Sequence, residues 1–427
     1  DGMHPEPWQW GRTGGVNLNI RSPKAVLEQK GDNMLTMGIE GTAHTLGVGI
    51  VDQDCNVFSN ELDMFRPPQG GLHPREAANH HAEVAADIMT RAMDKAGVSP
   101  KDIDLISFSM GPGLGPCLRV AATAARAFAC TRNIPIIGVN HCIAHIEIGR
   151  ALTGCRDPAL LYASGGNTQV IAFAEGRYRI FGETQDIGIG NMLDKLGRDL
   201  GMGFYAGPVF EKLAKEGSKY YELPYSVKGM DVAFSGMITA AVALHKKGVP
   251  LEDIALSVQE TAFAMLTEVT ERAMAHIGKK EVLLGGGVAQ NGRLRDMVED
   301  MAHARGAEMF VPDRQYCRDN GAMIAWLGAE MYNSGVRMDI SDTVVRQRFR
   351  TDEVEVGCAD LDLPAFGELP SEDLVEVLQE LVYHVGGNRS SGCDLMASAG
   401  SSDGCACFTH RHGEVYAPLE LTPHAPG

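Results

Sequence analysis

A glycine-rich turn between two short apolar segments occurs near the start of each half of this 427-residue chain. The first turn reads GTAH at residues 41–44, and the second reads SGGNT at residues 164–168. Short apolar runs joined by small residues predict antiparallel strands connected by a tight turn. The sequence therefore predicts two similar units, and each of them opens with a strand–turn–strand element.

Each unit continues with a third strand, amphipathic helices and further strands. In the first unit we expect strands at 35–40, 46–51, 57–64, 103–109 and 136–139, and helices at 75–96 and 118–130. In the second we expect strands at 159–163, 169–174, 178–181, 282–284 and 308–311, and helices at 190–200, 207–216, 236–245, 251–276 and 319–332. Sequence identity between the halves is weak, so the repeat is one of pattern.

This pattern predicts an α/β protein of actin-like (ASKHA) architecture, with a nucleotide and metal site in the cleft between two lobes. We expect the N-terminal lobe to span residues 34–150 and the C-terminal lobe to span 151–350. Residues 1–33 have no periodicity and are expected to be a disordered leader. Residues 351–427 are expected to be an acidic, weakly structured tail, loosest in the Ser/Gly-rich stretch 388–404.

The net charge of −17 is concentrated in that tail, where 2 basic and 14 acidic residues follow Arg350. The whole-chain charge therefore argues against strong unaided binding to nucleic acid. We find no apolar stretch long enough to cross a membrane and no secretory signal pattern. Six of the cysteines are scattered singly through the periodic region, which is typical of a reducing compartment. These features together favour a cytoplasmic protein without a membrane partner.

His141 and His145 are four residues apart on a predicted helix, so both imidazoles lie on one face and can reach one metal ion. Taken alone, such a pair is more often two histidines without a metal. A zinc protease helix would carry Glu directly after the first histidine as its general base. Cys142 occupies that position here, which weakens the protease interpretation.

Two glycine-rich loops are candidates for nucleotide binding. The loop at 164–168 can aim backbone N–H groups at a phosphate, although an ordinary hairpin turn has the same pattern. The glycines at 285–287 follow a buried strand and allow a flat ligand to approach the backbone closely. Asn291 either caps the helix after this loop or binds a ribose or amide group.

Two acidic residues remain open to two interpretations. Asp194 either forms an ion pair with Arg198 four residues later or accepts hydrogen bonds from a ribose hydroxyl or an amide. Asp319 either caps the last helix or supplies a carboxylate that completes a His/His/Asp metal site.

Several motifs together resemble the TsaD family, and most closely its archaeal and eukaryotic branch, the catalytic subunit of the KEOPS complex. They are GIEGTAHT (38–45), the His141/His145 pair, SGGNT (164–168), the stretch 186–198, VAFSG (232–236) and GGGVAQN (285–291). The resemblance extends from about Met34 to about Arg350. It implies the transfer of a threonylcarbamoyl group from threonylcarbamoyl-AMP to the N6 amine of the adenosine beside the tRNA anticodon.

The resemblance also implies a set of site residues. One divalent ion, iron or zinc, would be held by His141, His145, Tyr162 and Asp319. The adenine nucleotide, threonylcarbamoyl-AMP or ATP, would be bound by Tyr162, Ala163, Ser164, Gly165, Gly166, Asn167, Asp194, Gly207, Glu211, Gly286, Gly287 and Asn291. No catalytic base for the attacking amine is evident.

Partners and alternatives follow from the same resemblance. It implies tRNA as the substrate and KEOPS-type partner proteins that include a small kinase. Some relatives are fused to such a kinase, but the tail after Arg350 has no kinase loop motifs, so we expect no fusion. The alternatives are a metalloprotease (sialoglycoprotein endopeptidase), a non-catalytic ATP-binding subunit of a complex, and a sugar or acetate kinase of the same fold.

Overall fold

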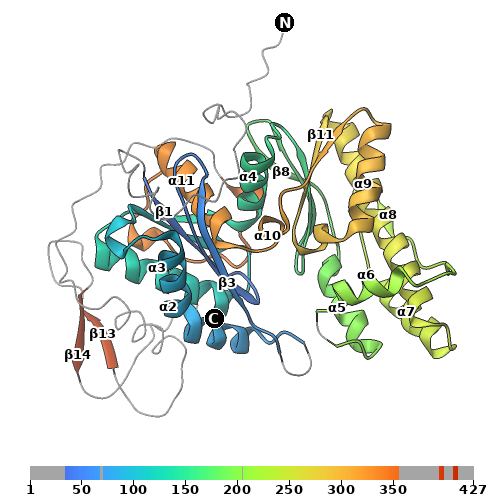
Figure 1. The fold of residues 1–427 in the computed structure, drawn as a ribbon, viewed down its shortest axis with the longest axis horizontal. Coiled ribbons are helices and arrows are strands. Elements are labelled where there is room, and N and C mark those ends of the chain that lie inside the picture. The colour runs from blue at the N-terminus through green and yellow to red at the C-terminus, as the bar shows by residue number, and fades with distance from the viewer. Residues whose placement is uncertain (1–33, 68–70, 204, 355–393, 399–406, 412–427) are drawn as a thin grey trace, which may run out of the picture.

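The computed structural model describes residues 34–67, 71–203, 205–354, 394–398 and 407–411. The predicted leader and most of the predicted tail lie outside these residues. Within them the chain forms two five-stranded sheets with helices, arranged as two lobes side by side (Figure 1).

The first sheet has the strand order β3-β2-β1-β4-β5. Its strands are β1 (Thr36–Glu40), β2 (Thr45–Val51), β3 (Val57–Met64), β4 (Leu105–Gly111) and β5 (Ile136–Asn140). The first three form an antiparallel meander, and β4 and β5 continue it in parallel. Helices α2 (Pro74–Ala96) and α3 (Gly115–Arg132) pack against one face, and a short 3-10 turn (Pro100–Asp102) precedes β4. The central strands β1, β2 and β4 are completely buried, which is typical of a sheet covered on both faces.

The second sheet repeats this topology in the order β8-β7-β6-β11-β12. Its strands are β6 (Ala159–Ala163), β7 (Thr168–Ala174), β8 (Arg177–Glu183), β11 (Glu281–Gly285) and β12 (Glu308–Phe310). The meander is again antiparallel, and the two added strands are again parallel. The predicted pattern repeat and the α/β actin-like architecture are therefore confirmed.

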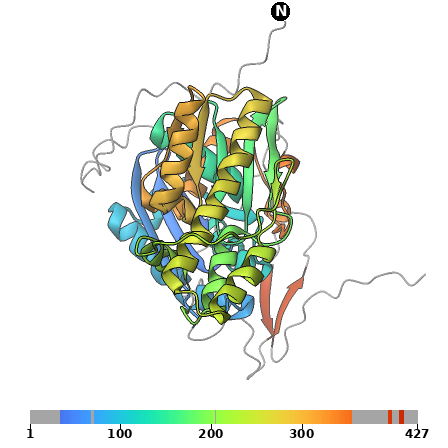
Figure 2. The same ribbon diagram turned by 90° about the vertical axis from the view of Figure 1, so that its right-hand side faces the viewer.

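The second lobe carries most of its helices on one side, with the long helix α8 nearest the viewer in Figure 2. These helices are α5 (Ile189–Asp199), α6 (Gly207–Ala214), α7 (Ser235–Lys246), α8 (Leu251–Ile277) and α9 (Gly292–Ala304). A small ladder of β9 (Val227–Lys228) and β10 (Asp231–Val232) precedes α7, and a 3-10 turn (Gly287–Gln290) precedes α9. Helix α8 contacts β6, β7 and β8 of the sheet and contributes Phe263, Leu266 and Val269 to the core of this lobe.

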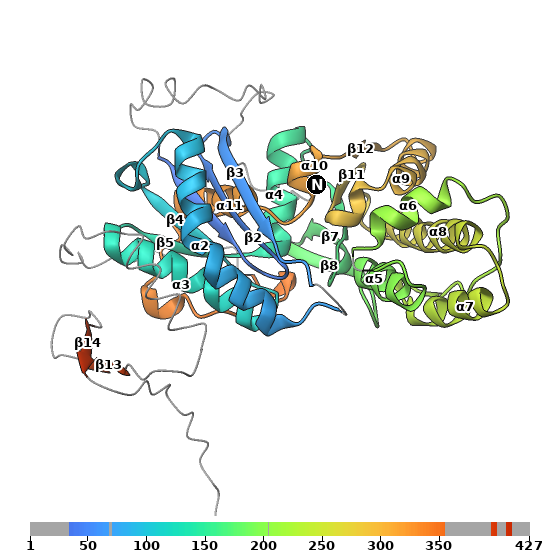
Figure 3. The ribbon, with the colours of Figure 1, turned by 60° about the horizontal axis from the view of Figure 1, so that its bottom comes forward.

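Helix α4 (His141–Thr153) lies between the two sheets (Figure 3). One side of it, with Ile143 and Ile148, packs in the cluster that includes β4 and β5. Its other side, with Cys142 and Ile146, packs against residues of the second sheet. Residues 141–149 are all buried, because a helix enclosed on both sides has no solvent face.

Helix α11 (Gly321–Asn333), which follows the short helix α10 (Arg314–Cys317), packs against β1 and β2 of the first sheet and against α4. The division at residue 150 therefore requires a correction, because it assigned this helix to the C-terminal lobe. The contact is possible because Gly38, Gly49 and Gly321 have no side chains: a Cβ on any of them would collide with backbone across the contact. Helical periodicity shows that a helix has an apolar face, but not which sheet that face meets.

The remaining elements follow α11. Short 3-10 turns lie at Ile340–Asp342 and Thr351–Glu353, and β13 (Asp394–Ser398) pairs with β14 (Cys407–Arg411) as an antiparallel hairpin. Strand β13 falls inside the stretch 388–404 that the sequence predicted to be loose, so that prediction is wrong at these residues. The long, apolar type of helix needed to cross a membrane does not occur in the described part of the chain.

The glycine contact under α11 can be tested by adding one methyl group. In Gly49→Ala the new Cβ would collide with the backbone of Ala322, and we expect overpacking to lower the free energy of unfolding by about 1–3 kcal/mol. Urea titration measures this change. Gly236→Ala is the matched control, because the nearest atom to its added Cβ is 3.8 Å away. Equal stability of the two variants would contradict a tight α11 contact.

A second prediction concerns Glu330, a buried residue of α11. Burial, followed by the nearby carboxylate of Glu147, raises the pKa of Glu330 from 4.5 to about 7. The folded protein thus binds the proton more tightly than the unfolded chain does, so this stabilisation is complete below the unfolded pKa and is lost as the pH rises through about 7. In urea titrations, raising the pH from about 5 to about 8 should reduce the stability of the wild type more than that of Glu330→Gln. Parallel pH profiles for the two proteins would disprove the assignment.

Candidate metal centre

The two histidines of α4 lie at the junction of the lobes. Helix α4 starts directly after β5, and Asn140 caps it by accepting hydrogen bonds from the backbone N–H groups of Cys142 and Ile143, at 3.0 and 3.2 Å. The cap fixes where the helix begins and so places His141 in its first turn. The rings of His141 and His145 are 4.9 Å apart between centroids, and both are buried.

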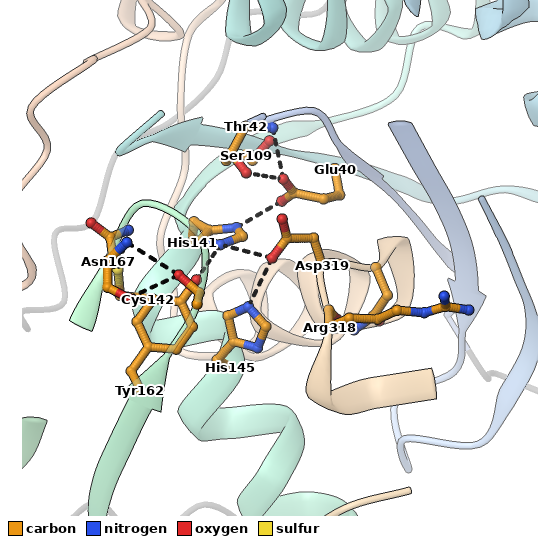
Figure 4. A network of polar contacts seen from close by, with 12 residues as sticks. Glu40, Thr42, Ser109, His141, Cys142, His145, Tyr162, Asn167, Arg318 and Asp319 are labelled. Atoms are coloured by element: carbon orange, nitrogen blue, oxygen red, sulfur yellow. Dashed lines mark hydrogen bonds and ion pairs between the residues drawn. The ribbon is translucent and has the colours of Figure 1, made fainter. Parts of the chain in front are cut away.

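Tyr162 and Asp319 come to the same point from other elements (Figure 4). The Tyr162 hydroxyl, on β6, lies 2.8 Å from Nε2 of His141. Oδ1 of Asp319, before α11, lies 3.4 Å from Nε2 of both His141 and His145. The four residues that the TsaD resemblance implied as metal ligands are therefore close together in space.

The unpaired Nε2 atom of His145 is evidence that this cluster of four side chains fits a metal ion. Its Nε2 is fully buried and has no hydrogen-bond partner, since the 3.4 Å approach to Asp319 is not a hydrogen bond. A buried polar atom without a partner is costly, and two imidazole nitrogens facing one carboxylate are a typical donor set for a divalent ion. Ligand atoms of His141, His145 and Asp319 all lie within 4.8 Å of one another.

The alternative for Asp319, a helix cap, is wrong. Asn320 caps α11 instead, because its Oδ1 accepts a hydrogen bond of 3.0 Å from the N–H of Met323. This arrangement leaves the Asp319 carboxylate free to face the histidines. The expected start of the helix at Asp319 is correspondingly two residues early.

The sequence reasoning missed Glu40, which ends β1 and is completely buried. Its Oε2 lies 2.9 Å from Nδ1 of His141, and its Oε1 accepts hydrogen bonds from the backbone N–H and the hydroxyl of Thr42. A carboxylate on the outer nitrogen orients the ring of a metal-binding histidine. The available signal was an acidic residue at the end of an otherwise apolar strand, immediately before the glycine turn.

The electrostatics of the group follow from its burial. Burial alone would lower the pKa of His141, but Glu40, Tyr162 and Asp319 together outweigh burial and raise this pKa well above the usual range. Burial lowers the pKa of His145. The charge of His141, together with the close approach of both imidazoles, holds the pKa of Asp319 well below its usual range, against the effect of burial. A metal ion would replace the protons of this group, because it binds neutral imidazole and ionised carboxylate.

The two glycine loops of the second lobe lie beside this group. In the loop at 164–168, the backbone N–H and the hydroxyl of Ser164 are within hydrogen-bond distance of the Asn167 carbonyl, at 2.9 and 3.0 Å. The amide of Asn167 lies 3.9 Å from the sulfur of Cys142 on α4. Gly286 has φ +90°, and a Cβ there would collide with the backbone of Ala163, so this position requires glycine.

The other predicted nucleotide residues divide into two groups. Gly166, Gly207 and Gly287 are open, with no atom within 4 Å of an added Cβ. Three polar side chains are already engaged: Asp194 accepts from the N–H of Ala206 at 2.7 Å, Glu211 from Gly292 at 3.2 Å, and Asn291 from Arg293 at 2.9 Å. Asn291 therefore caps α9, as one of its two interpretations had it. The Asp194–Arg198 ion pair is not found among the described residues.

A cavity of about 500 Å³ opens elsewhere along α4, beside Glu147, Arg150 and Tyr178. None of the predicted site residues lines it, so its volume does not bear on the metal group. The metal group is thus identified by the arrangement of its side chains and not by the presence of a large cavity.

The fold and this group define an actin-like, two-lobed protein with a metal-capable His/Asp cluster at the junction of its lobes. Among solved structures, HypF from T. kodakarensis is similar, with a TM-score of 0.52 at 15% identity over 70% of this chain and 48% of that one. At this identity the likeness shows the fold alone.

Sequence comparison identifies the family. The family model described as TsaD, tRNA N6-adenosine threonylcarbamoyltransferase, matches residues 56–326. The protein of that name from Thermococcus kodakarensis is 60% identical over 324 residues, which are 76% of this chain and 99% of the relative. A probable bifunctional tRNA threonylcarbamoyladenosine biosynthesis protein from Methanothermobacter thermautotrophicus is 58% identical, over 82% of this chain and 65% of its own length. The chain belongs to the TsaD family, and the resemblance found in its motifs is confirmed.

Metal affinity tests the role of Glu40. Glu40→Gln keeps the shape of the side chain but removes the charge that faces Nδ1 of His141, so we expect about 10- to 100-fold weaker binding of Zn²⁺. Calorimetric titration of the metal-free protein measures this affinity. His145→Ala should bind more weakly still, whereas Glu61→Gln, which pairs with Lys95 elsewhere, should match the wild type. Unchanged affinity in Glu40→Gln would remove Glu40 from the metal centre.

Proposed function

We propose that this chain transfers the threonylcarbamoyl group from threonylcarbamoyl-AMP to the N6 amine of the adenosine adjacent to the anticodon. The tRNAs concerned are those that read codons beginning with A. The observation that carries the proposal is the convergence of His141, His145, Tyr162 and Asp319 in a chain of the TsaD family. Close relatives such as the T. kodakarensis protein are named for this transferase activity.

The four converging residues would hold one divalent ion, iron or zinc. When bound, this ion supplies positive charge that polarises the reacting carbonyl or neutralises the phosphate of the leaving AMP. The protein's own contribution is to keep the ligands in place: Glu40 orients His141, and the Asn140 cap fixes the start of α4. Ligands held this way need little reorganisation when substrate arrives.

The adenine nucleotide would lie against the glycine loops of the second lobe. The open faces of Gly166, Gly207 and Gly287 leave room for a flat ring or a phosphate to approach the backbone. We assign nucleotide contacts to Tyr162, Ala163, Ser164, Gly165, Gly166, Asn167, Asp194, Gly207, Glu211, Gly286, Gly287 and Asn291. Fixing the adenylate beside the metal lowers the entropic cost of meeting the amine.

The polar residues of this set act in part through the backbone. Asp194 and Glu211 hold the segments around Ala206 and Gly292, so they would position the loops as well as contact a ribose. No side chain is assigned as the base that removes a proton from the attacking amine.

We infer that tRNA is the substrate and that KEOPS-type proteins, including a small kinase, are partners. The chain spans about two thirds of the bifunctional relatives. The near-neutral core is consistent with a chain that needs partners to hold a large polyanion.

The metalloprotease alternative is disfavoured by Cys142. This side chain is buried, and burial raises the pKa of its thiol to about 11, so it is neutral at physiological pH. A neutral, buried thiol cannot take the role of the glutamate base of a zinc protease helix.

A transfer assay tests the proposal. The wild-type chain, its partners, tRNA and threonylcarbamoyl-AMP should give threonylcarbamoyladenosine, detected by mass spectrometry of digested tRNA. His145→Ala should reduce the product at least about 100-fold, because it removes a ligand of the reacting centre. His276→Ala, at an exposed histidine in the last turn of α8, is the control and should retain activity.

Two outcomes would overturn the proposal. One is the absence of product with wild-type protein, and the other is equal product from His145→Ala. Cleavage of a sialoglycoprotein by the metal-loaded wild type would instead favour the protease.

A further inference from the structure

Tyr205 has an unusual position just before α6. Its φ is +64°, a left-handed conformation that side chains rarely adopt outside strained or functional sites. Among the described residues it is also one of the few large hydrophobic side chains that are exposed, at 39%. An aromatic ring held toward solvent by a strained backbone needs an explanation beyond packing.

Asp194 holds this strained segment in place. The Asp194 carboxylate, on α5, accepts a hydrogen bond of 2.7 Å from the N–H of Ala206, the residue after Tyr205. The segment around Tyr205 is therefore tied to α5. The strain at Tyr205 persists because this contact determines the backbone on one side of it.

Other exposed tyrosines of the second lobe are anchored by their hydroxyls. The hydroxyl of Tyr220, which is 52% exposed, lies 3.0 Å from that of Thr261, and Tyr225, 50% exposed, donates to Glu268 at 2.5 Å. Tyr205 has no such hydrogen bond within the part of the chain that the structure describes. Its ring is thus presented without a partner inside the protein.

The surroundings of Tyr205 connect it to the metal centre. Burial raises the pKa of its hydroxyl; Arg318 and Arg66 oppose this effect, and the carboxylates of Asp194 and Asp319 add to it. The tie to α5 through Asp194 also places this segment near the 164–168 turn beside the metal group, because at the start of α5 the N–H of Gly190 donates to the Ser164 carbonyl at 3.0 Å. Arg66 follows β3 of the first lobe.

The Arg318 side chain points away from His141 and His145 (Figure 4). Its backbone is extended, with φ −89° and ψ 170°, so its side chain and that of Asp319 project in different directions. Its Nε is buried without a hydrogen-bond partner. Arg66, Arg198 and Arg318 form no ion pair with any described residue, and the Arg198 guanidinium reaches Gly71 of the first lobe.

We propose that Tyr205 and Arg318 form the subsite for the acceptor nucleotide: the Tyr205 ring stacks on the adenine to be modified, and the Arg318 guanidinium binds its phosphate. The inference rests on the proposed function. RNA-binding proteins hold unpaired bases on exposed aromatic rings and phosphates on guanidinium groups. The base must leave its stack so that its amine can approach the metal centre, and stacking on the exposed Tyr205 ring compensates for the stacking that is lost.

The geometry favours the acceptor nucleotide over the adenylate. The glycine loops already offer open backbone for the adenylate at Gly166 and Gly287. Tyr205 is exposed, whereas Tyr162, His141 and His145 are buried. A macromolecular substrate can reach an exposed ring at the junction of the lobes more easily than a buried group.

Kinetics and fluorescence test Tyr205 in the full chain with its partners. Tyr205→Leu should raise the KM for tRNA about 10- to 100-fold and leave the KM for threonylcarbamoyl-AMP unchanged, because only the stacking surface is lost. Tyr205→Phe should retain the wild-type KM. Tyr225→Leu is the matched control, an exposed tyrosine of the same lobe away from the metal group.

A tRNA with 2-aminopurine at the acceptor position gives a direct signal of stacking, since this base lacks the reacting N6 amine. Its fluorescence should be quenched by the wild type, by Tyr205→Phe and by Tyr225→Leu, but not by Tyr205→Leu. Thermal unfolding of each variant separates a loss of stacking from a loss of fold. Equal quenching by a folded Tyr205→Leu protein would overturn the inference.

Variants of Arg318 test whether the phosphate that it binds belongs to tRNA or to the adenylate. Arg318→Ala should raise the KM for tRNA and reduce the slope of log affinity for tRNA against log salt by about 1, with partial recovery in Arg318→Lys. An increased KM for threonylcarbamoyl-AMP alone would assign Arg318 to the adenylate phosphate and overturn its place in the acceptor subsite. An inactive wild type would refute the transferase function, whereas an active wild type with unaffected Tyr205 and Arg318 variants would refute only the subsite.

Discussion

The enclosure of α4 between two sheets is the constraint on which the rest of the structure depends. Its first nine residues are buried, and its two sides pack in different hydrophobic clusters. Such a helix cannot turn without uncovering apolar surface on one side or the other. The direction of His141 and His145 is therefore set by packing along the whole helix, and not by the polar contacts alone.

The enclosure of α4 also buries polar side chains that need partners, and the residues of the metal group pair with one another there. Two imidazoles, a phenol and the Glu40 carboxylate are buried and the Asp319 carboxylate is partly buried, and buried charges are costly unless they are paired. Glu40, which accepts hydrogen bonds from Thr42, pairs with Nδ1 of His141, and Tyr162 and Asp319 approach Nε2 of the same ring. The atom left over is Nε2 of His145, which is where a divalent ion would complete the set.

The inner and outer parts of the site differ in rigidity. The inner group lies on a helix, a central strand and the residues before α11, and all of these are anchored in the cores of the lobes. The outer residues Tyr205 and Arg66 lie on connecting segments, where adaptation to a large substrate costs less. A rigid inner group combined with outer residues that can adapt suits an enzyme whose two substrates differ greatly in size.

The sequence by itself determined the elements and much of the site. The short apolar runs and glycine turns predicted that each half contains a strand–turn–strand element followed by helices and further strands, because apolar runs and turn chemistry are encoded in neighbouring residues. The His141/His145 pair was visible from helical spacing, and Asp319 was one of two open interpretations of its position, while Tyr162 came only from resemblance to a family. Tertiary structure decided the rest. The packing of α11 on the first sheet, the choice of Asn320 over Asp319 as a cap, the contact of Glu40 with His141 and the exposure of Tyr205 all depend on segments far apart in the chain. No local pattern specifies which surfaces such segments present to each other, since that follows from how the two lobes bury their apolar faces together.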